Sequence, residues 1–142
     1  MNVGTNTIVR WAAAALTLVG GLVHLKLWSD GYNDYPNANL GRMFLLNVVA
    51  SVAAAIAVAV WDHWMPVVGA LAIVVGSLFG FGISRIDTGV PFTAIDGVNF
   101  TEKGFDPSPE AMLALVSEVG AAALLVAVLA VTPLPRLIDR RR

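Results

Sequence analysis

Long apolar segments recur four times along the chain and alternate with short polar stretches. They cover residues 8–28, 43–61, 65–84 and 110–131. Each is close to the ~20 residues that cross a ~30 Å hydrocarbon layer as a helix rising ~1.5 Å per residue. A lone strand would leave its backbone groups unsatisfied in lipid, so helix is the expected state. The pattern predicts an all-α membrane protein, an antiparallel bundle of four transmembrane helices forming a single domain over residues 1–142.

Composition strengthens this prediction. The 142 residues are 57% hydrophobic and 13% charged, whereas soluble domains carry about 45–50% apolar and about 25% charged residues. Nine basic against ten acidic residues give a net charge of -1, which does not support binding to nucleic acid. The absence of cysteine excludes disulfides and thiolate metal sites.

Basic residues predict the orientation in the membrane. Five flank the predicted spans on the side of the two termini: Arg10, Arg136, Arg140, Arg141 and Arg142. Four flank them on the opposite side: Lys26, Arg42, Arg85 and Lys103. Basic flanks favour the cytoplasmic side, so we expect a multi-pass plasma-membrane protein with both termini in the cytoplasm. The first span lacks a small-residue cleavage pattern and is expected to be retained.

Both longer connections are predicted to lie outside the cell and to be ordered. Turn-forming residues fill the first, and Asp96-Gly97 in the second is typical of a type I′ hairpin. Ser108 is the expected N-cap of the last helix, with Pro109 in its first position. Acidic and aromatic side chains in these loops are candidate contacts for a partner protein: Asp30, Tyr32, Tyr35, Asp96 and Phe100.

Four polar residues interrupt the apolar spans at similar depth. At ~1.5 Å per residue they lie ~6 to ~12 Å from the outer ends of their spans: His24, Asn47, Ser77 and Glu118. A polar group in lipid is costly unless it is paired or faces a cavity, and small residues flank each one, as at closely packed helix faces. We therefore predict an outward-opening ligand pocket around these four residues. Its expected rim is formed by Lys26, Arg42, Arg85 and Asp87.

Structural explanations for the same residues stay open. Glu118 could be a protonated or His24-paired packing group, and Asn47 and Ser77 could be interhelical hydrogen-bonding residues. The Gly76-x-x-x-Gly80 spacing is a weak signal for close helix association.

The chemistry available to these residues is limited. A bis-histidine haem is not expected, because His24 and His63, the two histidines of the chain, are predicted on opposite sides of the membrane. Zinc or copper would need three or four nitrogen or sulfur ligands. Calcium in the acidic outer loops is an alternative, although EF-hand spacing is absent. We expect no cofactor, no metal and no complete catalytic set.

A group of residues in the first third of the chain resembles a known pattern. Its letters, G-x-x-H-L-x-L-W followed by G-Y, P and G-x-x-F-L-L-N, correspond to residues 21–28, 31–32, 36 and 41–47. The pattern is similar to that of small four-span membrane proteins of high-GC Gram-positive bacteria, with a looser likeness over residues 105–118. The resemblance implies four spans and a role for His24 and Asn47. That group has no assigned activity, so no catalytic residue is carried over.

Three functions follow as hypotheses. The small size and the acidic, aromatic outer loops favour an accessory subunit or assembly factor of a larger envelope or respiratory complex in a bacterial inner membrane. The alternative is a protein that binds a small apolar ligand, a quinone or a lipid, around His24 and Glu118. The third is a proton-linked permease, which would have to act as an oligomer because the chain lacks the inverted repeats and broken helices of carriers.

Overall fold

The computed structural model describes residues 3–34, 38–85 and 102–132, which form helices and their connecting turns and contain no strand. The helices are α1 (Val3–Leu27), α2 (Ala38–Val60), α3 (Trp64–Ser84) and α4 (Glu110–Val131). A short helical segment, η1 (Trp28–Tyr32), continues α1. Four helical segments in this part of the chain are long and apolar enough to span a bilayer. The part of the chain that the structure describes is all-helical, and its four long apolar helices are those of a multi-pass membrane protein.

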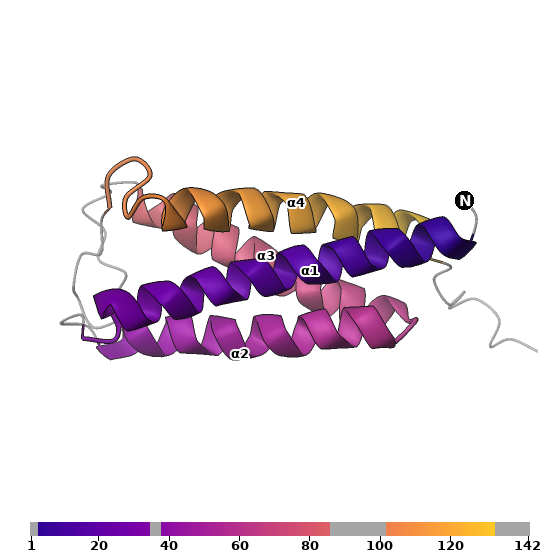
Figure 1. Cartoon of the computed structure of the whole chain (residues 1–142), viewed down its shortest axis with the longest axis horizontal. Coiled ribbons are helices and arrows are strands. Elements are labelled where there is room, and N and C mark those ends of the chain that lie inside the picture. Colours follow the sequence, from indigo (N-terminus) through magenta and orange to yellow (C-terminus); the bar gives the residue numbers. More distant parts are fainter. Residues whose placement is uncertain (1–2, 35–37, 86–101, 133–142) are drawn as a thin grey trace, which may run out of the picture.

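The four helices lie side by side, and consecutive helices run in opposite directions (Figure 1). Helix α1 packs along both α2 and α4. Helix α3 makes more extensive contact with α4 than it makes with α2. The start of α1, the α2–α3 connection and the end of α4 lie at one end, which we call the terminal end (Figure 1). The opposite end, where α1 passes into η1 and where α4 begins, is called the loop end.

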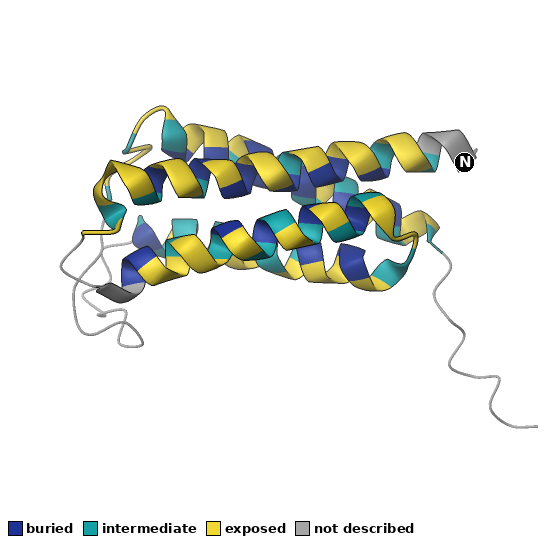
Figure 2. Ribbon diagram, turned by 60° about the horizontal axis from the view of Figure 1, so that its bottom comes forward, coloured by how far each residue is buried: buried dark blue, intermediate teal, exposed yellow. Residues whose placement is uncertain are grey.

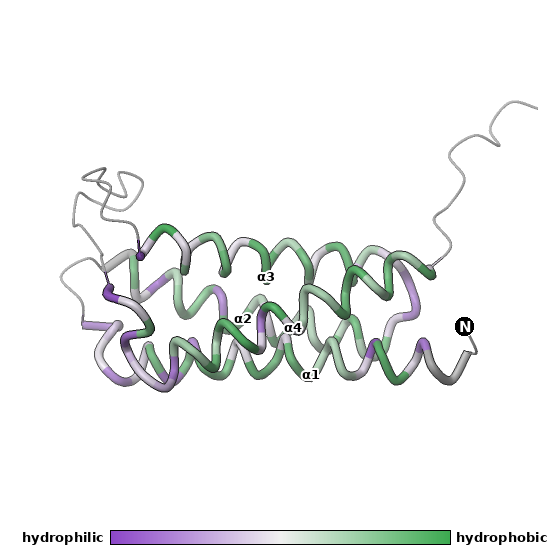
Figure 3. The backbone as a smooth tube through the Cα atoms, turned by 90° about the horizontal axis from the view of Figure 1, so that it is seen from above, coloured by the Kyte–Doolittle hydropathy of each residue, from purple (hydrophilic) through white to green (hydrophobic). Residues whose placement is uncertain are grey.

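Alanines together with valines and a leucine form the contact between the helices, while many other large apolar residues face outward. The central cluster of buried side chains includes Ala13, Ala55, Ala70 and Leu125. Outward positions such as those of Leu46 and Phe79 are each 68% exposed. Each helix is therefore striped by burial (Figure 2), while hydrophobic residues surround the middle of the molecule (Figure 3). An apolar outer surface of this extent is suited to lipid and not to water.

Two glycines allow α1 to approach its neighbours closely. A Cβ at Gly21 would lie 2.7 Å from the Cβ of Ser51 on α2, and one at Gly20 would lie 3.3 Å from Cγ of Glu118 on α4. By contrast, a Cβ at Gly76 or Gly80 of α3 meets no described neighbouring atom within 4 Å. The weak Gly76-x-x-x-Gly80 signal therefore does not mark a close contact with another described helix.

The helix ends differ from the predicted spans. Helix α1 and η1 extend through residues expected to form a loop, and the helical path breaks at Gly31, whose φ of 131° is open to glycine and strained for other residues. Helix α2 begins at Ala38 instead of residue 43. Pro109 is the N-cap of α4 and no side chain caps the helix, so the prediction that Ser108 does so is wrong. The predicted hairpin at Asp96-Gly97, between α3 and α4, lies outside the described residues.

A buried arginine closes the terminal end. The guanidinium of Arg10, on α1, donates hydrogen bonds to the backbone oxygen atoms of Val58 (2.9 Å) and Trp61 and lies 3.2 Å from the carboxylate of Asp62. The last carbonyl groups of a helix lack intrahelical partners and carry partial negative charge. Arg10 therefore caps α2 from the neighbouring helix.

Candidate functional site

A cavity of about 400 Å³ lies between the helices in the half of the molecule near the loop end. All four helices and η1 contribute to its wall. Most lining side chains are apolar, among them Leu27, Phe44 and Ala114. His24, Asn47, Ser77 and Glu118 line the same cavity. The structure thus places the four polar residues singled out in the sequence around one space.

Three of these residues form a hydrogen-bonded chain across three helices. Ser77 Oγ, on α3, donates to Glu118 Oε1, on α4, at 2.6 Å and lies 3.2 Å from His24 Nε2, on α1. His24 Nδ1 lies 2.8 Å from the Gly20 carbonyl oxygen and 3.7 Å from Glu118 Oε1. The side chain of Glu118 is 5% exposed and that of His24 is 14% exposed. The close approach at Gly20 is what allows this carboxyl to reach α1.

The positions of the hydrogens in the hydrogen-bonded chain of His24, Ser77 and Glu118 determine where it can hold a proton. The Gly20 carbonyl can only accept, so His24 Nδ1 carries a hydrogen. Ser77 has one hydroxyl hydrogen, and it donates to Glu118 Oε1. When His24 Nε2 is also protonated it can donate to Ser77, and the chain then runs from an imidazolium through a hydroxyl to a carboxylate. Without that hydrogen, Nε2 is an acceptor. The arrangement therefore connects a histidine and a glutamate through one serine hydroxyl.

Asn47, on α2, is not part of the hydrogen-bonded chain of His24, Ser77 and Glu118. Its Oδ1 accepts a hydrogen bond from Ser51 Oγ at 3.2 Å. This bond orients the amide and leaves Nδ2 as a donor at the cavity wall, where no described residue accepts from it. The ring of Phe44 lies near two other rings of the cavity wall, 5.3 Å from the His24 ring and 4.9 Å from that of Tyr32. Helix α2 therefore supplies one donor and an aromatic wall.

The part of the cavity wall nearest the loop end is held together by Tyr32, Arg85 and Glu102. The Tyr32 hydroxyl and the Arg85 guanidinium both donate to the Glu102 carboxylate. The Glu102 backbone N–H donates to the Ser84 carbonyl oxygen at 2.9 Å, joining this segment to the end of α3. Burial, assisted by the nearby carboxylate of Asp106, raises the pKa of Glu102 to about 7. Burial lowers the pKa of Arg85, and Asp106 partly offsets that effect.

Glu102 was not among the residues singled out from the sequence. It lies in a polar connection, where an acidic residue is ordinarily solvated. Its role follows from contacts with residues 17 and 70 positions away in the chain. No local pattern in the sequence identifies such contacts.

The remaining predicted rim and loop residues fall in different places. Arg85 lines the cavity, whereas Lys26 is exposed outside it and pairs with Asp30 and, at 3.2 Å, with Glu110. Arg42 is exposed and does not line the cavity. Tyr32, expected in a partner-facing loop, is half-buried against Phe44. The other predicted rim and loop residues, Asp87, Tyr35, Asp96 and Phe100, lie outside the described residues.

The described residues offer no cluster of three or more His, Cys, Asp or Glu side chains that could hold a metal ion. His24 lies near the loop end of α1, and His63 lies in the α2–α3 connection at the terminal end. The two imidazoles therefore cannot ligate one haem.

Comparisons of the chain with models of known protein families, with curated proteins and with solved structures each find no match. The likeness to small four-span proteins of Gram-positive bacteria stays a prediction.

Proposed function

We propose that this protein crosses the plasma membrane as an antiparallel four-helix bundle and binds a small apolar ligand, a quinone or a lipid, in its cavity. In this orientation both termini are cytoplasmic and the cavity lies in the outer half of the bilayer. The observation that carries the proposal is the polar chain of His24, Ser77 and Glu118 in an otherwise largely apolar cavity. Ligand sites are typically apolar spaces of about 300–1,000 Å³ with a few convergent polar groups.

The size of the cavity limits the ligand. A cavity of about 150 Å³ holds a benzene molecule, and this one measures about 400 Å³. It can therefore hold a substituted ring, or a small polar head with the first part of a chain. Each contact that the Glu118 carboxylate makes with the described residues runs through Oε1. Asn47 Nδ2 can then donate to a carbonyl or hydroxyl oxygen of the ligand. Glu118 Oε2 can accept from a hydroxyl, or donate to a carbonyl when it carries a proton.

Other functions receive less support from the described residues. The prediction of an accessory subunit rested on the acidic and aromatic outer loops, and Tyr32 and Asp30 make contacts within the chain. Purification from native membranes in mild detergent tests that prediction. Uptake that depends on a pH gradient in proteoliposomes tests the permease hypothesis.

Ligand binding is tested with decylubiquinone and four versions of the full chain. We expect the probe to raise the unfolding temperature of the wild type. Ser77→Ala and Glu118→Gln should weaken binding by tenfold or more, because each interrupts the polar chain. Ser117→Ala is the matched control, since Ser117 is buried beside Glu118 but its Oγ donates to Ala114 O of its own helix at 2.9 Å. An unresponsive wild type, or equal affinity in all four proteins, would disprove the proposal.

A further inference from the structure

The wall of the cavity between α2 and α3 also lies on the outer surface of the molecule. On α3 it is formed by Ala72, Gly76 and Gly80, spaced four residues apart on one face. On α2 it includes Met43 and Leu46, which are 48% and 68% exposed. Residues that line a cavity while being this exposed mark a place where the cavity reaches the surface. Surface at this depth of a membrane-spanning bundle faces lipid.

The arrangement of the helices explains this opening. Helix α3 starts beside α2 at the terminal end and crosses toward α4 at the loop end (Figure 1). The cavity occupies the side from which α3 departs, and its lining there includes the two glycines that face open space. At the loop end, by contrast, lining residues Tyr32, Arg85 and Glu102 are bonded to one another. Access is therefore sideways, between α2 and α3.

Charge at the cavity restricts the ligand further. Arg85 is the one Lys or Arg side chain among the described lining residues. Its Nε donates to Gly104 O and its Nη2 to Asp106 O, each at 2.8 Å, while its Nη1 donates to Ser84 and Glu102. Recognition of a phosphate group uses cationic side chains with available donors. Four of the five N–H donors of Arg85 are thus bonded within the described residues. A phosphate-bearing head would find one donor left on this side chain and would meet the carboxyl group of Glu118.

We propose that a neutral, lipid-soluble molecule enters the cavity from the bilayer through a portal between α2 and α3. Its polar oxygen atoms bind Asn47 Nδ2 and Glu118 Oε2, and its apolar tail leaves between the two helices across Gly76 and Gly80. This inference rests on the proposed ligand-binding function and adds the route and the charge of the ligand. A quinone and a neutral single-chain lipid share this chemistry.

Filling the portal tests the route. Gly76→Leu and Gly80→Leu each place a side chain at the portal, and its Cβ meets no described neighbouring atom within 4 Å. Gly69→Leu is the matched control, because Gly69 lies on the same helix in equally open space and does not line the cavity. With decylubiquinone as the probe we expect at least a tenfold loss of affinity for both portal variants and less than a twofold change for the control. Two portal variants keep the test decisive if one of them does not fold.

The charge of the ligand is tested by competition. Monooleoylglycerol and oleoyl lysophosphatidate share one chain and differ in the phosphate. We expect the neutral lipid to displace decylubiquinone at a concentration at least tenfold lower than the phosphate-bearing one.

The outcomes separate the two proposals. Full affinity in both portal variants, together with loss of binding in Glu118→Gln, would overturn the portal and keep the ligand-binding function. Equal or better competition by the lysophosphatidate would overturn the requirement for a neutral ligand. A wild type that binds no probe would overturn both proposals.

Discussion

Ser77 connects parts of the chain that are far apart in sequence, because its hydroxyl lies between His24 on α1 and Glu118 on α4. The similar depth of these residues could be predicted, since the rise per residue of a helix is fixed. The bonds between them could not. They depend on the rotation of each helix and on the close approach at Gly20, which are set by packing over the whole length of α1.

Arg10 shows the same limit of sequence interpretation. As a basic residue near a terminus, Arg10 contributes to the predicted orientation. Its burial against the end of α2, where it is 5% exposed, comes from tertiary packing. Arg10→Ala leaves two carbonyl groups without their donor. Hydrogen bonds to charged groups contribute about 1.5–3 kcal/mol, so we expect a loss of about 2–3 kcal/mol, measured by SDS-induced unfolding.

Asp62→Asn is the control for Arg10. The Asp62 side chain is 87% exposed, and exposed ion pairs contribute about 0–1 kcal/mol. A similar loss in both variants would assign the effect to the ion pair and not to the capping of α2.

Glu102 predicts a dependence of stability on pH. Its pKa is raised from 4.5 to about 7 in the folded protein, so between these values the folded state holds a proton that the unfolded state lacks. This contribution to stability is complete below about pH 4.5 and is lost as the pH rises through about 7. Glu102→Gln removes the titration. The unfolding temperature of the variant relative to the wild type should therefore be higher at pH 8 than at pH 5, and an unchanged difference would contradict the assignment.

At the scale of the helices, the existence of four spans follows from composition and length, while their ends and contacts do not. Proline at 109 and glycine at 31 change the local path in ways that the apolar pattern does not record. Glycine spacing was likewise ambiguous, because the same residue type forms tight contacts on α1 and open wall on α3. How each helix packs against its neighbours decides whether its glycines form a tight contact or an open wall.

This difference between glycines predicts opposite changes in the free energy of unfolding for Gly21→Ala and Gly69→Ala. Gly21→Ala brings a methyl group to 2.7 Å from Ser51 Cβ, and we expect overpacking to cost about 1–3 kcal/mol. Gly69→Ala meets no described neighbouring atom within 4 Å and should gain about 0.5–1 kcal/mol from helix propensity. Both are measured by SDS-induced unfolding. Destabilisation by both would contradict the close α1–α2 contact.

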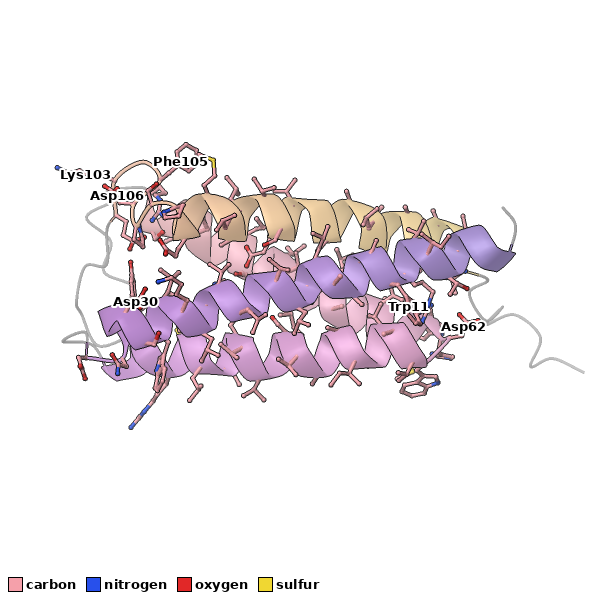
Figure 4. All side chains as sticks on the ribbon, in the orientation of Figure 1. Trp11, Asp30, Asp62, Lys103, Phe105 and Asp106 are labelled. Carbon is pink, nitrogen blue, oxygen red and sulfur yellow. The ribbon has the colours of Figure 1, made fainter. Side chains whose placement is uncertain are left out.

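At the scale of the whole molecule, the orientation rests on a small excess of basic residues. Asp62 and Lys103 lie at opposite ends of the molecule (Figure 4) and both are exposed. Because the chain has no cysteine, Asp62→Cys and Lys103→Cys each provide a unique thiol. With an impermeant maleimide on intact cells, we expect labelling at position 103 alone, and at position 62 only after permeabilisation. The reverse pattern would place the cavity in the inner half of the bilayer.

The hydrogen-bonded chain draws one residue from the first, the third and the last helix, which has a consequence for biogenesis. During synthesis the histidine and the serine enter the bilayer before the glutamate has been made. The site can form only when insertion is complete, and a nascent chain arrested before α4 lacks the carboxyl group to which Ser77 donates. Under the proposed function, occupancy of the cavity by a ligand would thus distinguish a finished polypeptide from a truncated one.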